Sequence, residues 1–170
     1  APDKHKELTA QPNEGILDFV TDLNEKNVDM WIRHVVVPGI TDDDKYLFEM
    51  LILESFQAGL SWECVLNKRE AFEKAYDNFD IEKIINYDET KILELSENKN
   101  IIRNKRKIEA TINNSIIFMN IQEEYGSFSN YIWKFTNGNI IKNIDDNIKT
   151  TSKLSDEISI NLKRRGMKFV

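Results

Sequence analysis

The first candidate for chemistry is an acidic side chain in the middle of a largely apolar stretch. Glu54 lies in the sequence LFEMLILESFQAGLSW, which runs from Leu47 to Trp62. A carboxylate among apolar side chains costs free energy unless it is paired or used. Two interpretations are open: a core acid that is satisfied by a backbone cap or an arginine, and a pocket acid that faces a bound polar or cationic group.

An aromatic side chain follows this acid after a predicted turn. Trp62 comes eight residues after Glu54 and shortly after Gly59, which is a natural end for a helix, so the two side chains can line one pocket. A single tryptophan is more often part of a core than of a binding site. Trp62 therefore supports a pocket only in combination with Glu54.

The second candidate is the basic segment 98–107, NKNIIRNKRK, which has five Lys or Arg residues and no acid. It joins two predicted helices and so presents backbone N–H groups at a helix N-terminus, where phosphate is favoured. Its cations add salt-dependent attraction to nucleic acid. A solvated charged loop is the alternative, but Ile101 and Ile102 would hold the turn on the core. The segment is therefore a candidate for binding phosphates of a nucleic acid.

Helices are predicted to position both candidates. Asp42, Asp43 and Asp44 can cap a helix that continues to Phe56 and is apolar nearly all round, so it should lie at the centre of the domain. Ser61 begins the next helix, whose apolar face extends from Trp62 to Phe72. The remaining predicted helices are 81–85, 89–95, 105–124, 127–135 and 155–165. The cations at 163–165 are ordinary partners of a helix C-terminus and suggest no function.

The first 44 residues have a different pattern. Residues 13–26 carry apolar side chains at helical spacing, and residues 28–37 are rich in β-branched side chains. They predict one helix and one strand, a unit that cannot cover its own apolar faces. Pairing of the strand 31–37 with a second copy, giving a dimer or an aggregate, is an alternative.

Composition fits a single helical domain. The chain has 170 residues, of which 41% are hydrophobic, and a net charge of −6. The first 44 residues carry the whole of this negative charge, so the acidic balance does not exclude a nucleic-acid partner. No apolar run approaches the roughly 20 residues of a membrane span, and no signal segment is evident. We expect a cytoplasmic protein without a membrane partner.

Residues 45–170 resemble the DNA-3-methyladenine glycosylase I family, a branch of the helix-hairpin-helix DNA repair glycosylases. The resemblance is carried, in order, by LFEMLILESFQAGLSW, KREAF, FDIEKI, NIIRNKRKIEATINN, YGSFSNYIWKF and LKRRGMKFV. It implies a mainly α, helix-hairpin-helix fold. It also implies that the N-glycosidic bond of 3-methyladenine is hydrolysed in alkylated double-stranded DNA, the first step of base excision repair.

The resemblance assigns roles to residues. Glu54 matches the catalytic pocket glutamate that contacts the flipped base, Trp62 matches the tryptophan that stacks on this base, and we place Gln57 with the base-binding residues. The hairpin that grips DNA is matched by Lys99, Asn100, Ile101, Arg103, Asn104 and Lys105. The family often has Gly where this chain has Asn100, and Asn is the next-best residue for a left-handed turn.

Residues 1–44 resemble part of another family, the pyruvate formate-lyase activating enzymes, which are radical S-adenosylmethionine proteins. HKELTAQPNEGILDF and VDMWIRHVVVPGITDDD carry this resemblance, and Arg33 matches a position near that family's cofactor site. The cluster-binding CxxxCxxC is absent, and a single cysteine cannot hold an iron–sulfur cluster. The two resemblances together indicate a fusion joined near residues 42–47.

No cofactor is expected. The glycosylase family binds a structural zinc through a Cys and a His from its first segment and a second such pair from its last helix, and neither pair is present here. Cys64 and His34 are more typical of packing residues. Without that last helix we expect a C-terminally truncated domain, uncovered apolar surface around Leu51 and impaired activity. The alternatives are a DNA-binding module without catalysis and a fragment of a glycyl-radical activating enzyme.

Overall fold

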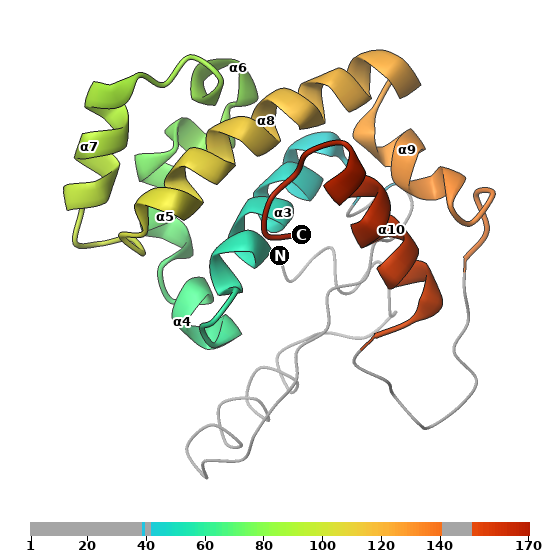
Figure 1. The fold of residues 1–170 in the computed structure, drawn as a ribbon, viewed down its shortest axis with the longest axis horizontal. Coiled ribbons are helices and arrows are strands. Elements are labelled where there is room, and N and C mark those ends of the chain that lie inside the picture. The colour runs from blue at the N-terminus through green and yellow to red at the C-terminus, as the bar shows by residue number, and fades with distance from the viewer. Residues whose placement is uncertain (1–38, 40–41, 141–150) are drawn as a thin grey trace, which may run out of the picture. The chain divides into compact units, whose positions relative to one another are not determined.

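The computed structural model describes residues 39, 42–140 and 151–170, and these residues form helices and no strand. The helix and strand that we predict at 13–26 and 28–37 lie outside the described residues. All of the helices below belong to one compact unit, Asp43–Val170, shown in Figure 1. The mainly helical fold predicted for this part of the chain is confirmed.

Helix α3 (Asp44–Gln57) is the buried centre of this unit, as predicted. Its N-cap, Asp43, accepts a hydrogen bond from the backbone N–H of Tyr46 at 3.0 Å. Large apolar side chains on several sides of the helix are fully buried, namely Phe48, Ile52, Leu53 and Phe56. Leu51, around which we expect uncovered apolar surface, is half-buried. The helix packs against α4 (Trp62–Leu66), α8 (Lys105–Tyr125) and α9 (Phe128–Lys134).

The predicted helix from Ser61 to Phe72 is wrong in one respect, because it is divided in two. Ser61 caps α4 as expected, but α4 ends at Leu66 and a new helix, α5 (Arg69–Ala75), begins after Asn67 and Lys68. This break produces a corner at Lys68. Because the corner interrupts the helical direction, the side chains of α4 and α5 do not form one continuous face.

A left-handed turn follows α5 and has no counterpart in our predictions. Residues Asp77–Phe79 form the 3₁₀ turn η1 with φ angles of 50°, 57° and 54°. Left-handed backbone costs roughly 1–2 kcal/mol per non-glycine residue. Two contacts offset this cost: the hydroxyl of Tyr87 donates to Asp77 at 2.6 Å, and the rings of Tyr76 and Phe79 stack with an angle of 2° between their planes.

The remaining helices agree with the predicted ranges to within a few residues. Asp80 caps α6 (Ile81–Ile84) and Asp88 caps α7 (Glu89–Glu97), as expected. Helix α8 ends at Gly126, which is left-handed. Helix α10 (Lys153–Arg164) begins earlier than predicted, because Ser152 is its cap and Ser155 is the partner in a reciprocal capping box.

Helix α8 connects the two ends of the unit. It packs against α6 and α7 at one end and against α9 at the other, and it crosses α3 between them (Figure 1). The amide of its buried Asn114 binds the backbone of Lys168 twice, donating to the carbonyl and accepting from the N–H, each at 2.9 Å. Helix α8 therefore also fixes the segment that follows α10.

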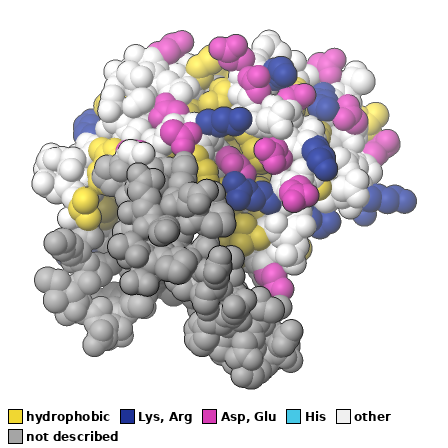
Figure 2. Space-filling view, turned by 180° about the vertical axis from the view of Figure 1, so that it is seen from behind, with side chains coloured by type: hydrophobic (Ala, Val, Ile, Leu, Met, Phe, Trp, Pro, Cys, Tyr) yellow, Lys and Arg dark blue, Asp and Glu magenta, His cyan; other side chains and the backbone are white. Residues whose placement is uncertain are grey.

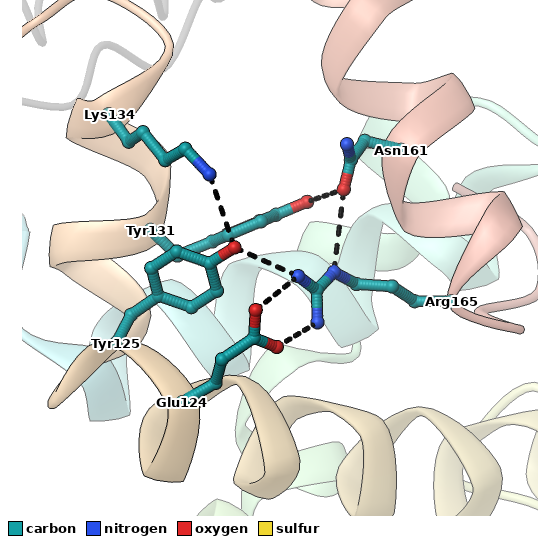
Figure 3. A network of polar contacts seen from close by, with 6 residues as sticks. All are labelled: Glu124, Tyr125, Tyr131, Lys134, Asn161 and Arg165. Carbon is teal, nitrogen blue, oxygen red and sulfur yellow. Dashed lines mark hydrogen bonds and ion pairs between the residues drawn. The ribbon is translucent and has the colours of Figure 1, made fainter.

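Arg165, at the end of α10, joins three helices (Figure 3). Its guanidinium binds the carboxylate of Glu124 through two hydrogen bonds of 2.6 and 3.1 Å, and it also donates to the hydroxyl of Tyr125. The same group lies 5.2 Å from the ring centre of Tyr131 on α9. Arg165 is therefore a structural cation, which agrees with our assigning no function to residues 163–165.

We predict that Glu124 titrates far below an ordinary glutamate. The hydrogen bond from Arg165 lowers the pKa of this carboxyl to about 2, so the stabilisation is complete above pH 4.5 and is lost as the pH falls toward 2. Carboxyl carbon NMR of the wild type should show this low midpoint. In Arg165→Met it should move toward 4.5, whereas the exposed Lys163→Met should leave it low; a wild-type midpoint near 4.5 would contradict the ion pair.

Candidate functional site

Glu54 lies on α3, but its side chain points out of the core. It is exposed, and it makes no hydrogen bond or ion pair with any described residue. The surrounding protein nevertheless removes enough water to raise the pKa of this carboxyl above its ordinary 4.5. The other central acid of the helix, Glu49, is the one that binds an arginine, Arg69, at 2.6 and 3.1 Å. The core-acid interpretation of Glu54 thus finds no partner, and the pocket interpretation remains.

Gln57 and Trp62 lie around the turn that follows Glu54. Gln57 is the last residue of α3, three residues after Glu54 and therefore on the same side of the helix. Its carbonyl accepts from the N–H of Leu60 at 2.6 Å, and Gly59 supplies the left-handed step with a φ of 81°. Trp62 then opens α4, and its side chain is half-buried. The three predicted pocket residues therefore come from two helix ends joined by one tight turn.

The end of α3 is held by a residue that our sequence analysis placed only in the basic segment. The ammonium of Lys107 on α8 donates to the carbonyls of Phe56 and Ala58 at 2.7 and 2.6 Å, and its side chain is 4% exposed. Burial lowers the pKa of this lysine. The sequence does contain a signal for this burial. Lys107, Asn114 and Phe118 follow one another at steps of seven and four residues, which places them on one face of α8, and all three are buried.

The segment between α7 and α8, residues 98–104, is called the interhelical turn below. The side chain of Asn98 accepts from the N–H of Asn100 at 3.0 Å and shapes the turn. Asn104 caps α8 by accepting from the N–H of Lys107. The side chain of Ile101 is 3% exposed and holds the turn on the core, as predicted.

One expectation about the interhelical turn needs correction. Asn100 is not among the described residues with a positive φ, so the left-handed conformation suggested by comparison with glycine is wrong; the Asn98 side chain makes the turn instead. The burial of Ile101 leaves only its backbone for contact with a nucleic acid.

The cations of the predicted DNA surface are all accessible. Lys99, Arg103 and Lys105 are exposed, as are the polar Asn100 and Asn104, whereas Lys107 points inward. The described surface is not uniformly basic: on the face drawn in Figure 2, Lys and Arg side chains are interspersed with Asp and Glu. Attraction of an anion therefore depends on the local cluster at the interhelical turn.

An open polar hollow of about 570 Å³ adjoins the interhelical turn. It is lined by the Lys68 corner and α5 on one side, and by the end of α7 and residues Asn98, Lys99 and Asn100 on the other. Neither Glu54 nor Trp62 lines it. The hollow is therefore separate from the predicted base pocket.

The described residues offer no metal centre. Within 42–140 and 151–170, no group of three or more His, Cys, Asp or Glu side chains could hold a metal ion. Cys64 is half-buried on α4. These residues do not fit the structural zinc implied by the resemblance. No helix in the described part of the chain is both long and apolar enough to cross a bilayer.

Comparison with known proteins identifies relatives over most of the chain. A family model described as methyladenine glycosylase matches residues 34–170. The DNA-3-methyladenine glycosylases of Escherichia coli and Haemophilus influenzae are 37% and 35% identical over 131 residues, which are 75% of this chain and 70% and 71% of theirs. The structure of 3-methyladenine DNA glycosylase I from Staphylococcus aureus matches with a TM-score of 0.70 and 36% identity, over 75% of this chain and 69% of that one.

A second, shorter similarity is also found. A pyruvate formate-lyase-activating enzyme of Staphylococcus epidermidis is 48% identical over 48 residues, which are 28% of this chain and 19% of that protein. This finding confirms the second resemblance for a short segment. Because it covers only about a fifth of that enzyme, it carries no argument about activity here.

We predict that Glu54→Gln stabilises the fold at neutral pH. A raised pKa means that the folded state favours the protonated carboxyl, so the wild type loses stability as the pH rises above 4.5 and the neutral glutamine does not. Urea unfolding at about pH 4 and about pH 7 should show an advantage of the variant that grows with pH. The exposed Glu123→Gln is the control. An equal effect at both pH values would contradict the desolvation of Glu54.

Proposed function

We propose, because the chain belongs to the methyladenine glycosylase family, that it is a hydrolase which removes 3-methyladenine from alkylated double-stranded DNA. The observation that carries the proposal is Glu54, an accessible carboxylate with a raised pKa and no partner among the described residues. The corresponding process is the first step of base excision repair. Since the relatives are bacterial and the substrate is chromosomal DNA, the proposed location is the cytoplasm.

The chemistry suits a carboxylate that recognises charge. Methylation at N3 makes the adenine positively charged and a good leaving group. The enzyme flips the nucleotide out of the duplex, and water adds to C1′ of the sugar as the bond to the base breaks. The bond's electron pair neutralises the departing base, and one proton is released. Because the base is already activated, the site needs less general-base help than it would for a normal adenine.

Glu54, Trp62 and Gln57 take the roles of the base pocket in this proposal. A partly desolvated carboxylate attracts a cationic base more strongly than a hydrated one does, since the local dielectric is lower. The face of the Trp62 ring favours a cation through its quadrupole. Gln57 offers an amide that can donate to or accept from the base edge. These groups together favour the methylated, cationic purine over a neutral one.

The interhelical turn takes the role of the DNA-gripping hairpin. Helix α7, the turn and α8 form two helices joined by a short connection, and the N-terminus of α8 faces outward from Asn104. Backbone N–H groups at such an end favour phosphate, and Lys99, Arg103 and Lys105 add charge. Asn100 and the backbone of Ile101 complete the proposed surface. No step of the proposed reaction uses a metal ion.

A DNA-binding module without catalysis is the second candidate. It is favoured by one observation, which is that the basic cluster and the pocket residues come from separate segments, so that one can work without the other. It predicts salt-sensitive DNA binding and no base release.

We predict that the chain releases 3-methyladenine from methylated duplex DNA and that Glu54→Gln slows release by about 10²-fold, because the charge facing the base is lost. Trp62→Ala should also slow release, since the stacking face is removed. Single-turnover assays with chromatography of the freed base measure both rates. Glu123→Gln, an exposed acid on α8, should keep the wild-type rate. Binding without release in the wild type would instead favour the non-catalytic module.

We predict that the cations of the interhelical turn account for part of the salt dependence of DNA binding. Each cation that contacts a phosphate contributes about 0.9 to the slope of log affinity against log salt. Replacing Lys99, Arg103 and Lys105 together by Gln should lower that slope by up to about 2.7. Fluorescence anisotropy with undamaged duplex measures it. The exposed Lys163→Gln on α10 should leave the slope unchanged; an equal loss in both variants would refute the assignment.

A further inference from the structure

Two lysines join the proposed base pocket to the proposed DNA-binding turn. The segment from Ala58 to Lys68, called the Trp62 segment, contains the turn after α3, the whole of α4 and the corner before α5. Each end of this segment is hydrogen-bonded to the chain between Asn100 and Lys107. Both hydrogen bonds have a lysine ammonium as donor and a backbone carbonyl as acceptor.

The bond at the beginning of the Trp62 segment is buried. Lys107 donates to Ala58 at 2.6 Å and to Phe56 at 2.7 Å. These carbonyls lie at the C-terminus of α3, where the helix dipole favours a cation, and α3 has no basic residue in its own last turn. Lys107 supplies that charge from α8. It lies three residues after Asn104, and its own backbone N–H donates to the capping side chain of Asn104.

The bond at the end of the segment is more accessible. Lys68 donates to the carbonyl of Asn100 at 3.1 Å, across 32 residues of chain. Lys68 stands at the corner that breaks the predicted continuous helix, between α4 and α5. Asn100 in turn is fixed by its own bond to Asn98.

The two bonds close a ring of chain. It passes from Ala58 through Trp62 to Lys68, crosses to Asn100, and returns through Asn104 and Lys107 to Ala58. We propose, resting on the function proposed above, that Lys68 and Lys107 are positioning residues that fix Trp62 relative to the DNA-binding turn. Contact of the turn with DNA then sets the place of the stacking ring.

This role follows from the tolerance of catalysis to misplacement. A displacement of about 1 Å at a reacting group can cost about 10²-fold in rate, even when the altered residue is far from the chemistry. Trp62 opens a helix of five residues, which is too short to hold its own position in water. Its position therefore depends on tertiary contacts, which are the packing of the buried Val65 against the core and the hydrogen bonds at the two ends of the segment.

Lys68→Met is the decisive variant, because Lys68 is accessible and its loss leaves no buried charge. We expect single-turnover base release to fall at least about tenfold, while affinity for undamaged duplex changes less than about twofold. Lys68→Arg keeps a donor and should restore most of the rate. Lys74→Met, which removes an exposed cation from the same hollow, should release base at the wild-type rate.

A second measurement does not depend on catalysis. With Trp31→Phe and Trp133→Phe in the background, Trp62 is the single tryptophan, and acrylamide quenching reports its exposure. Lys68→Met should increase quenching and Lys68→Arg should not. If the wild type releases no base, the proposed function fails while quenching still tests the positioning role. Unchanged quenching in Lys68→Met would overturn the positioning role. So would a release rate that falls in parallel with DNA affinity, because Lys68 would then be a phosphate ligand.

Lys107→Met tests the buried end of the ring. Its loss leaves the carbonyls of Phe56 and Ala58 without their donor, so we expect a lower melting temperature as well as slower release. The variant is compared at a temperature where circular dichroism shows it folded. Wild-type release from the folded variant would overturn the role of Lys107, and an unfolded variant leaves the decision to Lys68.

Discussion

The unit depends on a buried ammonium group. Lys107 is almost fully removed from water, and a desolvated cation is tolerated only where partners compensate it. Its partners are two carbonyls that α3 itself leaves unbonded at its last turn. The ammonium needs the carbonyls and the carbonyls need a donor, so this contact fixes helices α3 and α8 relative to each other. The same contact fixes the turn before α8 relative to the turn after α3.

The two glutamates of α3 show how a single helix can carry one acid for stability and another for binding. Glu49 is satisfied by Arg69, and this pair ties α3 to α5. Glu54 has no such partner among the described residues, and burial raises its pKa, which is unfavourable for folding and favourable for binding a cation. Proteins commonly break a local rule of stability at functional positions and compensate elsewhere. Here the compensation is the large apolar core around the same helix.

Local signals predicted most helices of the described unit. Asp43, Ser61, Asp80 and Asp88 cap helices where the sequence places them, because capping depends on residues close in the chain. The corner at Lys68, the left-handed turn at 77–79 and the inward direction of Lys107 were not predicted. The corner and the inward lysine involve contacts with residues distant in the chain, such as the carbonyl of Asn100, and the left-handed turn is held by Tyr87 and by the stacked rings of Tyr76 and Phe79. The pocket residues were identified through family resemblance, since a lone acid and a lone tryptophan are not specific.

The amide of Asn114 has a consequence for how the chain can vary. It binds Lys168 entirely through the backbone, as a neighbouring strand would, and so it is indifferent to the side chain at that position. The path of the segment that follows α10 is also held by the buried side chain of Met167 and by hydrogen bonds from Asn113 to the carbonyl of Gly166 and from Ser159 to the carbonyl of Val170. Substitutions at position 168 should therefore have little effect on the two hydrogen bonds to Asn114, whereas a substitution of Asn114 removes both of them.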